Sequence, residues 1–358
     1  MRILAQLLVA TCACSLGPIA LAAQAEKSPK PAAECAVRWK GDTFKGAAIA
    51  SGISDAVAGA AAVWGAWAGA QGYVLDLDPD MRRLFIHREA RSASSEAALL
   101  ARALAAVDKL APRPRGSAKP ARVLAVLELD GPKDLGTLLD DLGQRFNYLA
   151  TWARGEKGQL GFVLEEPLAA AFLATAPDVK EWNPKNELVN RAAQLALFER
   201  FGRIPNWLMQ GLAWHVELSV LNSIYCFPFR SGFVAKKEHK SWSEQLKSLV
   251  VPPGPEVAPR RLTIDDLTGW KRGTYENDRA LIAWGAASFL AKKHPEALPL
   301  ILDDLRVLRE KESKLTKPDG SWQIDPDYEV PADKQLAILK ARAGEDFFAE
   351  LQRFCAGN

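Results

Sequence analysis

The sequence has 358 residues, of which 48% are hydrophobic and 25% are charged, and its formal net charge at pH 7 is +3. This composition is typical of a globular protein that is long enough for more than one folding unit. The small net charge and the lack of a strongly basic run exclude nucleic acid as the expected partner.

Residues 1–25 have the pattern of a signal peptide. Arg2 precedes an apolar segment from Ile3 to Ala22, and Ala23-Gln24-Ala25 offers a cleavage site of the A-x-A type. We therefore expect an exported protein, periplasmic or extracellular, with envelope association as an option and no membrane span after signal cleavage. The alternatives are an uncleaved membrane anchor, or a lipoprotein that is anchored through Cys12 or Cys14.

The mature chain keeps three cysteines, Cys35, Cys226 and Cys355. Export permits one disulfide among them and leaves one thiol over, and the sequence does not select the pair. The mature chain has no C-x-x-C motif, so a cysteine zinc site or a redox motif is not expected.

Residues 26–115 are expected to form an N-terminal α/β segment. The alanine- and glycine-rich residues 47–70 predict a packed helix, since their longest apolar run is shorter than a membrane span requires. Residues 72–89 alternate on both sides of Asp78-Pro79-Asp80 and predict a β-hairpin, with His87 as a surface or cross-strand residue. Residues 95–110 predict a helix, and a proline-rich loop follows it.

Residues 116–225 are expected to form the central part of the fold. Residues 121–129 and 161–164 predict strands, residues 134–146 predict a helix, and residues 168–174 predict a strand or the edge of a helix. These segments precede two helices within residues 183–217. Asn183 can cap the first of these helices, Gly202 ends it, and Pro205 sets the start of the second.

The first of the two helices contains Asn186-Glu187-Leu188-Val189-Asn190. The pattern parallels the zinc motif H-E-x-x-H, in which two imidazoles four residues apart share one helix face and the glutamate activates a bound water. In this chain asparagines stand at both histidine positions, and the glutamate is kept.

The continuation Pro205 to Ala213 contains Trp207-Leu208 and Gln210-Gly211-Leu212-Ala213. Together with the first motif it resembles the W-L-x-E-G-[LF]-A stretch of gluzincin metallopeptidases, in the peptidase MA-like families. In that resemblance Gln210, which lies 20 residues after Asn190, takes the place of the third zinc ligand.

The resemblance implies an α+β, zincin-like fold with a small mixed sheet, a two-helix site core and a helical C-terminal half. It also implies that the zinc site is lost, because amides are poor substitutes for imidazole and carboxylate ligands. We expect no bound metal or other cofactor, and Glu187 as a vestigial general base that lies at the solvent edge or bonds the amides.

Three roles remain open for the amides. Asn186, Asn190 and Gln210 could hydrogen-bond one another and fill the former metal cavity. They could line a pocket, with Trp214 and Glu217 beside them, that binds a peptide or protein partner or a small polar ligand without cleaving it. They could also hold a hard cation together with Glu187. In active relatives an edge strand of the sheet binds the substrate backbone by strand addition.

Residues 226–358 are expected to form a helical C-terminal subdomain. A basic piece around Lys236 and Lys240 is interpreted as a solvated face. Helices are predicted for residues 264–270, 277–293 and 295–312, a polar loop for 317–331, and two last helices within 334–354.

The sequence favours an exported, catalytically inactive homologue of a gluzincin metallopeptidase that binds a peptide or protein partner in the former active-site cleft. One alternative is an active zinc metallopeptidase with non-standard ligands. The chain has four histidines, and His215 is expected to point away from the Gln210 face. The other alternative is a structural envelope protein with no ligand.

Overall fold

The computed structural model describes residues 36–39, 42–45, 55–78, 82–88, 94–114, 122–176, 182–230, 238–251, 254, 260–318, 321–325 and 327–357. The signal peptide expected at residues 1–25 and Cys35 lie outside these ranges. The fold is α+β, as the sequence predicts, and no helix among the described residues has the length and apolar character needed to cross a membrane.

Within the described residues, a mixed sheet of seven strands runs in the order β2-β1-β3-β4-β5-β7-β6. The pairs β1/β3, β4/β5 and β5/β7 are parallel, and the remaining neighbours are antiparallel. The strands are β1 (Ala36–Trp39), β2 (Asp42–Lys45), β3 (Tyr73–Asp78), β4 (Arg83–Arg88), β5 (Leu124–Leu129), β6 (Gly161–Leu164) and β7 (Ala169–Leu173).

The expected boundary at residue 115 falls between β4 and β5, which lie side by side in this sheet. Strands from both expected segments therefore share one sheet and its two cores. The predicted hairpin is confirmed as β3 and β4. His87 is fully buried and its Nε2 lies 2.8 Å from Asp76 Oδ2, so the cross-strand position is confirmed and the surface position is wrong.

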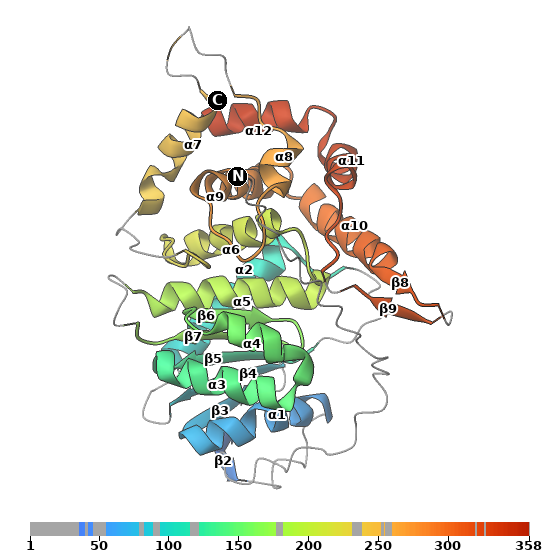
Figure 1. The fold of residues 1–358 in the computed structure, drawn as a ribbon. Coiled ribbons are helices and arrows are strands. Elements are labelled where there is room, and N and C mark those ends of the chain that lie inside the picture. Colours follow the sequence, from blue (N-terminus) through green and yellow to red (C-terminus); the bar gives the residue numbers. More distant parts are fainter. Residues whose placement is uncertain are drawn as a thin grey trace, which may run out of the picture.

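Helices cover both faces of the sheet, because the inner strands place apolar side chains on alternate faces (Figure 1). Along β5, Val126 faces one core, and Ala125 and Leu127 face the other. The Val126 face carries α2 (Ser94–Leu110) and α5 (Pro184–Phe201). The opposite face carries α1 (Asp55–Gln71), α3 (Pro132–Arg145), the short helix η2 (Asn147–Leu149) and α4 (Ala150–Glu156).

The C-terminal half stacks further helices on α5, on the side away from the sheet (Figure 1). Helix α6 (Asn206–Leu221) lies between α5 and α9, and it is buried on nearly all sides. The remaining elements are η3 (Glu238–Ser241), α7 (Trp242–Val250), α8 (Ile264–Thr268), α9 (Asn277–Lys293), α10 (Ala297–Glu312), β8 (Lys314–Thr316), β9 (Trp322–Ile324), α11 (Ala332–Ala343) and α12 (Phe347–Ala356).

The predicted pair of helices within residues 183–217 is confirmed. Asn183 occupies the N-cap position of α5, but its side chain makes no capping hydrogen bond. Gly202 ends α5 with a φ of 66°, a left-handed value that glycine adopts at little cost. Pro205 precedes the first turn of α6, as expected.

The structure corrects three further expectations. The predicted polar loop at 317–331 contains β9, which pairs with β8 as a hairpin. Helices α4 and α7 have no counterpart in the sequence analysis. Cys226 and Cys355 are both free and buried, so neither forms the disulfide that export would permit.

Candidate functional site

The α5–α6 pair brings Asn186, Asn190 and Glu217 together in the interior. Asn186 Nδ2 donates to Glu217 Oε1 over 2.6 Å, and Asn190 Nδ2 donates to Glu217 Oε2 over 2.8 Å. None of the three residues is more than 1% exposed. Because Asn186 and Asn190 are four residues apart, they share one face of α5, and both of their amides meet the same carboxylate.

Glu217 also accepts two main-chain hydrogen bonds from the segment that follows α6. Tyr225 N and Cys226 N donate to its Oε1 over 2.6 and 3.1 Å. The chain reaches this position because Asn222, at the C-cap of α6, adopts a left-handed φ of 53°. Burial raises the pKa of Glu217 to about 8, although the hydrogen bonds from Tyr225, Asn186, Asn190 and Cys226 oppose this shift.

The amides continue a polar row along α5. Gln194 Nε2 donates to Asn190 Oδ1 over 2.7 Å, and Asn186 Nδ2 also donates to Ser223 O over 3.0 Å. Asn186 and Asn190 therefore bond to Glu217 and to flanking groups, and no hydrogen bond joins one to the other. The expectation that the predicted amides fill the cavity by bonding one another is wrong, because a carboxylate takes their N–H groups.

Glu187 lies on a different side of α5. Its Oε2 accepts from Arg191 Nε over 2.8 Å, and both side chains are at least nine-tenths buried. The expected solvent-edge position and the expected bond to the amides are both wrong, because a cation one turn along the same helix binds this carboxylate. Arg191 in turn lies against the start of β6, where a Cβ added to Gly161 would come within 2.8 Å of its Nε.

Gln210 lies two helical turns before Glu217 on α6 and does not reach the cluster. It is 5% exposed, and its Oε1 has no hydrogen-bond partner among the described residues. The helix pair is an antiparallel hairpin with a short turn at Gly202 to Pro205. For that reason the residue of α6 that lies opposite Asn186 and Asn190 is Glu217, and Gln210 lies closer to the turn.

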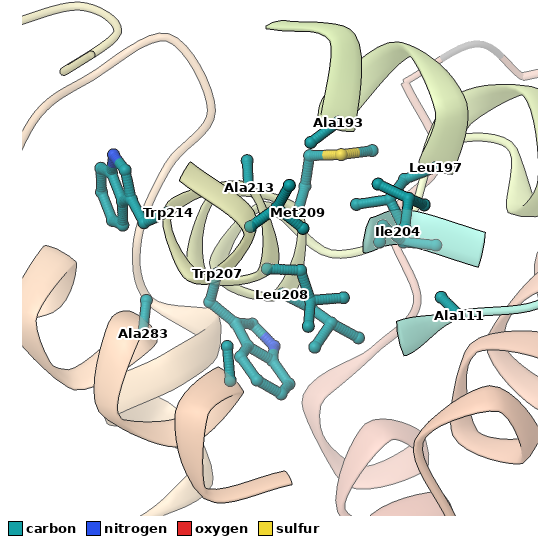
Figure 2. Close-up of a cluster of buried hydrophobic side chains, with 14 of the residues drawn as sticks. Ala111, Ala193, Leu197, Ile204, Trp207, Leu208, Met209, Ala213, Trp214 and Ala283 are labelled. Atoms are coloured by element: carbon teal, nitrogen blue, oxygen red, sulfur yellow. The ribbon is translucent and has the colours of Figure 1, made fainter. Parts of the chain in front are cut away.

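Trp214 does not reach the amides either. Figure 2 shows its indole on the side of α6 opposite Met209, whose side chain points toward Ala193 of α5. Its Nε1 donates to Cys226 O over 2.7 Å, and its ring packs on Trp242 and Trp270 at centroid distances of 5.3 and 5.9 Å. Trp214 thus belongs to an aromatic core between α6, α7 and the end of α8.

The residues present do not fit a zinc ion. Asn186 and Asn190 turn their N–H groups toward Glu217, and an amide N–H has no lone pair to give a metal. Gln210, the expected third position, lies elsewhere. Among the described residues, no group of three His, Cys, Asp or Glu side chains is placed to hold a metal ion.

The sequence analysis missed Gln194, Arg191 and the main-chain donors Tyr225 and Cys226. Two of these could have been found from residue spacing in the sequence. Gln194 continues the four-residue spacing of Asn186 and Asn190, and Arg191 lies four residues after Glu187. No sequence pattern indicates the main-chain donors Tyr225 and Cys226, because their position depends on the turn after α6.

No family model matches the chain, and no curated protein matches it. The interpretation of the site therefore depends on its own geometry.

Proposed function

We propose that this chain is an exported, catalytically inactive protein with the zincin-like helix frame of gluzincin peptidases, and that it binds an extended peptide segment of a partner. The convergence of Asn186 and Asn190 on Glu217 carries the proposal. The two positions that would present metal ligands instead bond to a buried carboxylate, which supports a helix frame without the means of activating water.

Glu187 supports the same conclusion. A general base needs a free carboxylate within reach of a polarised water. Glu187 is bonded to Arg191 over 2.8 Å in the interior, which leaves it poorly placed for proton transfer.

The edge of the sheet supports the choice of an extended peptide as partner. β6 is the last strand of the sheet, runs antiparallel to β7, and has no strand on its outer side among the described residues. A peptide could add there as a further strand through main-chain hydrogen bonds. Val163 is the partly exposed residue of β6, and its side chain packs against the core that contains α5, so a charge there would disturb the edge strand to which such a peptide adds.

The test is to pan a displayed library of random dodecapeptides against the mature chain and against Val163→Asp. The proposal expects enriched peptides that bind the unmodified chain and bind at least about tenfold more weakly to Val163→Asp. Val307→Asp is the matched control, because Val307 is 51% exposed on α10, outside the sheet. Proteolysis that a chelator blocks and that Glu187→Gln removes would contradict the inactive assignment.

A structural protein with no cleft ligand is the second candidate, and the burial of the cluster favours it. Asn186, Asn190 and Glu217 satisfy one another and are closed to solvent. In that case panning yields no enriched peptide, and substitutions in the cluster change stability alone.

A further inference from the structure

Three arginines from separate segments meet near the C-terminal end of α5. Arg203 lies in the turn between α5 and α6, Arg272 between α8 and α9, and Arg309 on α10. Arg272 Nη2 donates to Ile204 O over 3.0 Å, and Arg309 Nη1 would lie 3.7 Å from a Cβ added to Gly202. The three guanidinium groups are thus gathered around residues 202–204.

Carboxylates face this cluster but stop short of hydrogen-bond distance. Glu165 Oε2 lies 3.8 Å from Arg203 Nε, and Asp327 Oδ1 lies 3.7 Å from Arg203 Nη1. Glu329 Oε1 lies 3.8 Å from Arg272 Nε.

Well-formed pairs elsewhere in the molecule are much shorter. Arg88 Nε to Asp130 Oδ2 and Arg342 Nε to Asp304 Oδ2 are both 2.7 Å. A charge-assisted hydrogen bond between guanidinium and carboxylate is about 2.7–2.9 Å long. The three pairs of Arg203 with Glu165 and Asp327 and of Arg272 with Glu329 are therefore ion pairs at distances longer than a hydrogen bond.

Buried donor groups in the cluster lack acceptors. The Nε atoms of Arg272 and Arg309 are both buried, and no described residue accepts a hydrogen bond from either. A buried donor without a partner costs about 1–3 kcal/mol. Burial also lowers the pKa of Arg272 to about 10, and Arg203 lowers it further by repulsion between like charges.

Solvent still reaches the cluster from outside. The side chains of Arg203 and Arg272 are 25% and 29% exposed, so a small ion can approach without unfolding the chain. The cluster thus combines accumulated positive charge, buried donors without acceptors and an open side.

We propose that Arg203, Arg272 and Arg309 form a binding site for a tetrahedral oxyanion of the phosphate or sulfate type. Such an ion has several acceptor oxygens and can bond to more than one guanidinium at once, which the single carboxylates at the rim do not do. The site lies at the opposite end of α5 from Asn186 and does not depend on the function proposed above.

The test is calorimetric titration of the mature chain with inorganic phosphate at fixed ionic strength, and separately with sulfate. The proposal expects saturable binding and a higher melting temperature in the presence of the ion. Arg309→Met should weaken binding at least about tenfold. Arg306→Met is the matched control on the same helix, because Arg306 already pairs with Asp303 and Glu310, and it should leave binding unchanged.

Substitution of the carboxylates that face the arginines provides an independent test. Glu165→Gln and Glu329→Gln remove competitors for the guanidinium groups and should tighten phosphate binding several-fold. Should Arg309→Met fail to fold, Arg272→Lys replaces it, since lysine keeps the charge but lacks the planar fork and should bind phosphate more weakly. Absence of saturable binding, or binding that these substitutions leave unchanged, overturns the proposal.

Discussion

Glu217 is the residue of α6 that binds both Asn186 and Asn190 of α5. Motif comparison points to Gln210 as the partner of Asn186 and Asn190, since Gln210 stands before Gly211 at the expected spacing. The structure puts Glu217 there instead, because the turn between the helices is short and the hairpin register follows from its length. The polar residues of α5 and α6 could thus be predicted from the sequence, but which residue of α6 lies opposite Asn186 and Asn190 could not.

The buried carboxyl of Glu217 should make stability depend on pH. Its pKa is raised to about 8, against about 4.3 for an unperturbed glutamic acid. Between these values the folded chain holds a proton that the unfolded chain has released, so the contribution of Glu217 to stability is fully present below about pH 4.3 and is lost as pH rises through 8. We expect Glu217 to lower the free energy of unfolding between about pH 5 and pH 8 by on the order of 1 kcal/mol per pH unit.

Denaturant unfolding at a series of pH values measures this slope. Glu217→Gln should flatten it, because an amide does not titrate, whereas the exposed Glu244→Gln should leave it as in the unmodified chain. An unchanged slope in Glu217→Gln would assign the pH dependence to another group.

The pair Glu187–Arg191 should contribute far more to stability than its spacing suggests. Removing one partner of a buried ion pair leaves the other charge uncompensated, at a cost of about 3–5 kcal/mol. Glu187→Gln should therefore lower the free energy of unfolding by roughly that amount. The electrostatic attraction between Glu156 and Arg191 would reduce the loss. Equilibrium urea unfolding provides the measurement.

The chain offers a matched control with the same spacing. Arg306 and Glu310 are also four residues apart, at 2.9 Å, but the Glu310 side chain is 40% exposed. Glu310→Gln should cost no more than about 0.5 kcal/mol, as is usual for exposed helix pairs. Equal losses for Glu187→Gln and Glu310→Gln would show that Glu187 is not buried as described.

At the scale of elements, apolar spacing and cap residues located most helices. Helix α9 coincides with its prediction at 277–293, and Gly202 and Pro205 correctly separate α5 from α6. Helix α4 and strand β9 were missed because they are short, with seven and three residues, and tertiary contacts determine their conformation. Residues 168–174 are all apolar, so their pattern left strand and helix open, and the structure resolves residues 169–173 as β7.

The contact between α6 and α9 should depend on Gly211. A Cβ at this position would lie 2.4 Å from Ala283 O and 2.8 Å from Ala287 Cβ. Alanine favours a helix over glycine by about 1 kcal/mol, but the two helices would have to separate to admit the methyl group. We expect Gly211→Ala to lower the free energy of unfolding by about 1–3 kcal/mol, measured by urea unfolding.

Gly136 in α3 provides the control, since a Cβ there would meet no atom within 4 Å. Gly136→Ala should stabilise the chain by up to about 1 kcal/mol. The opposite signs of the two substitutions would separate helix propensity from helix packing, and a stabilising Gly211→Ala would show that the helices are not so closely packed.

For the molecule as a whole, the α+β class was predictable, because strand-like segments precede a helical half. The division into segments at residue 115 is not visible in the sheet, because β4 and β5 pair across it. Parallel pairing joins strands that are distant in sequence, and no local pattern specifies which strands will be neighbours.

The proposed relation to metallopeptidases can be tested on the whole chain by introducing histidines. Asn186→His with Asn190→His would face two imidazoles toward Glu217, which together are ligand types that zinc prefers. We expect this double variant to bind one equivalent of zinc, measured by metal analysis after dialysis, and circular dichroism to show that it keeps its fold. The unmodified chain should bind none.

Two further substitutions in the double variant decide which acidic position completes the site. Adding Glu217→Gln should abolish zinc binding, because it removes the carboxylate that lies 2.6 and 2.8 Å from the two replaced side chains. Adding Gln210→Glu should change little, since Gln210 lies two turns away on α6. If zinc bound only when Gln210→Glu was present, the motif comparison would be right about the third position, and Glu217 would not be the residue of α6 that lies opposite Asn186 and Asn190.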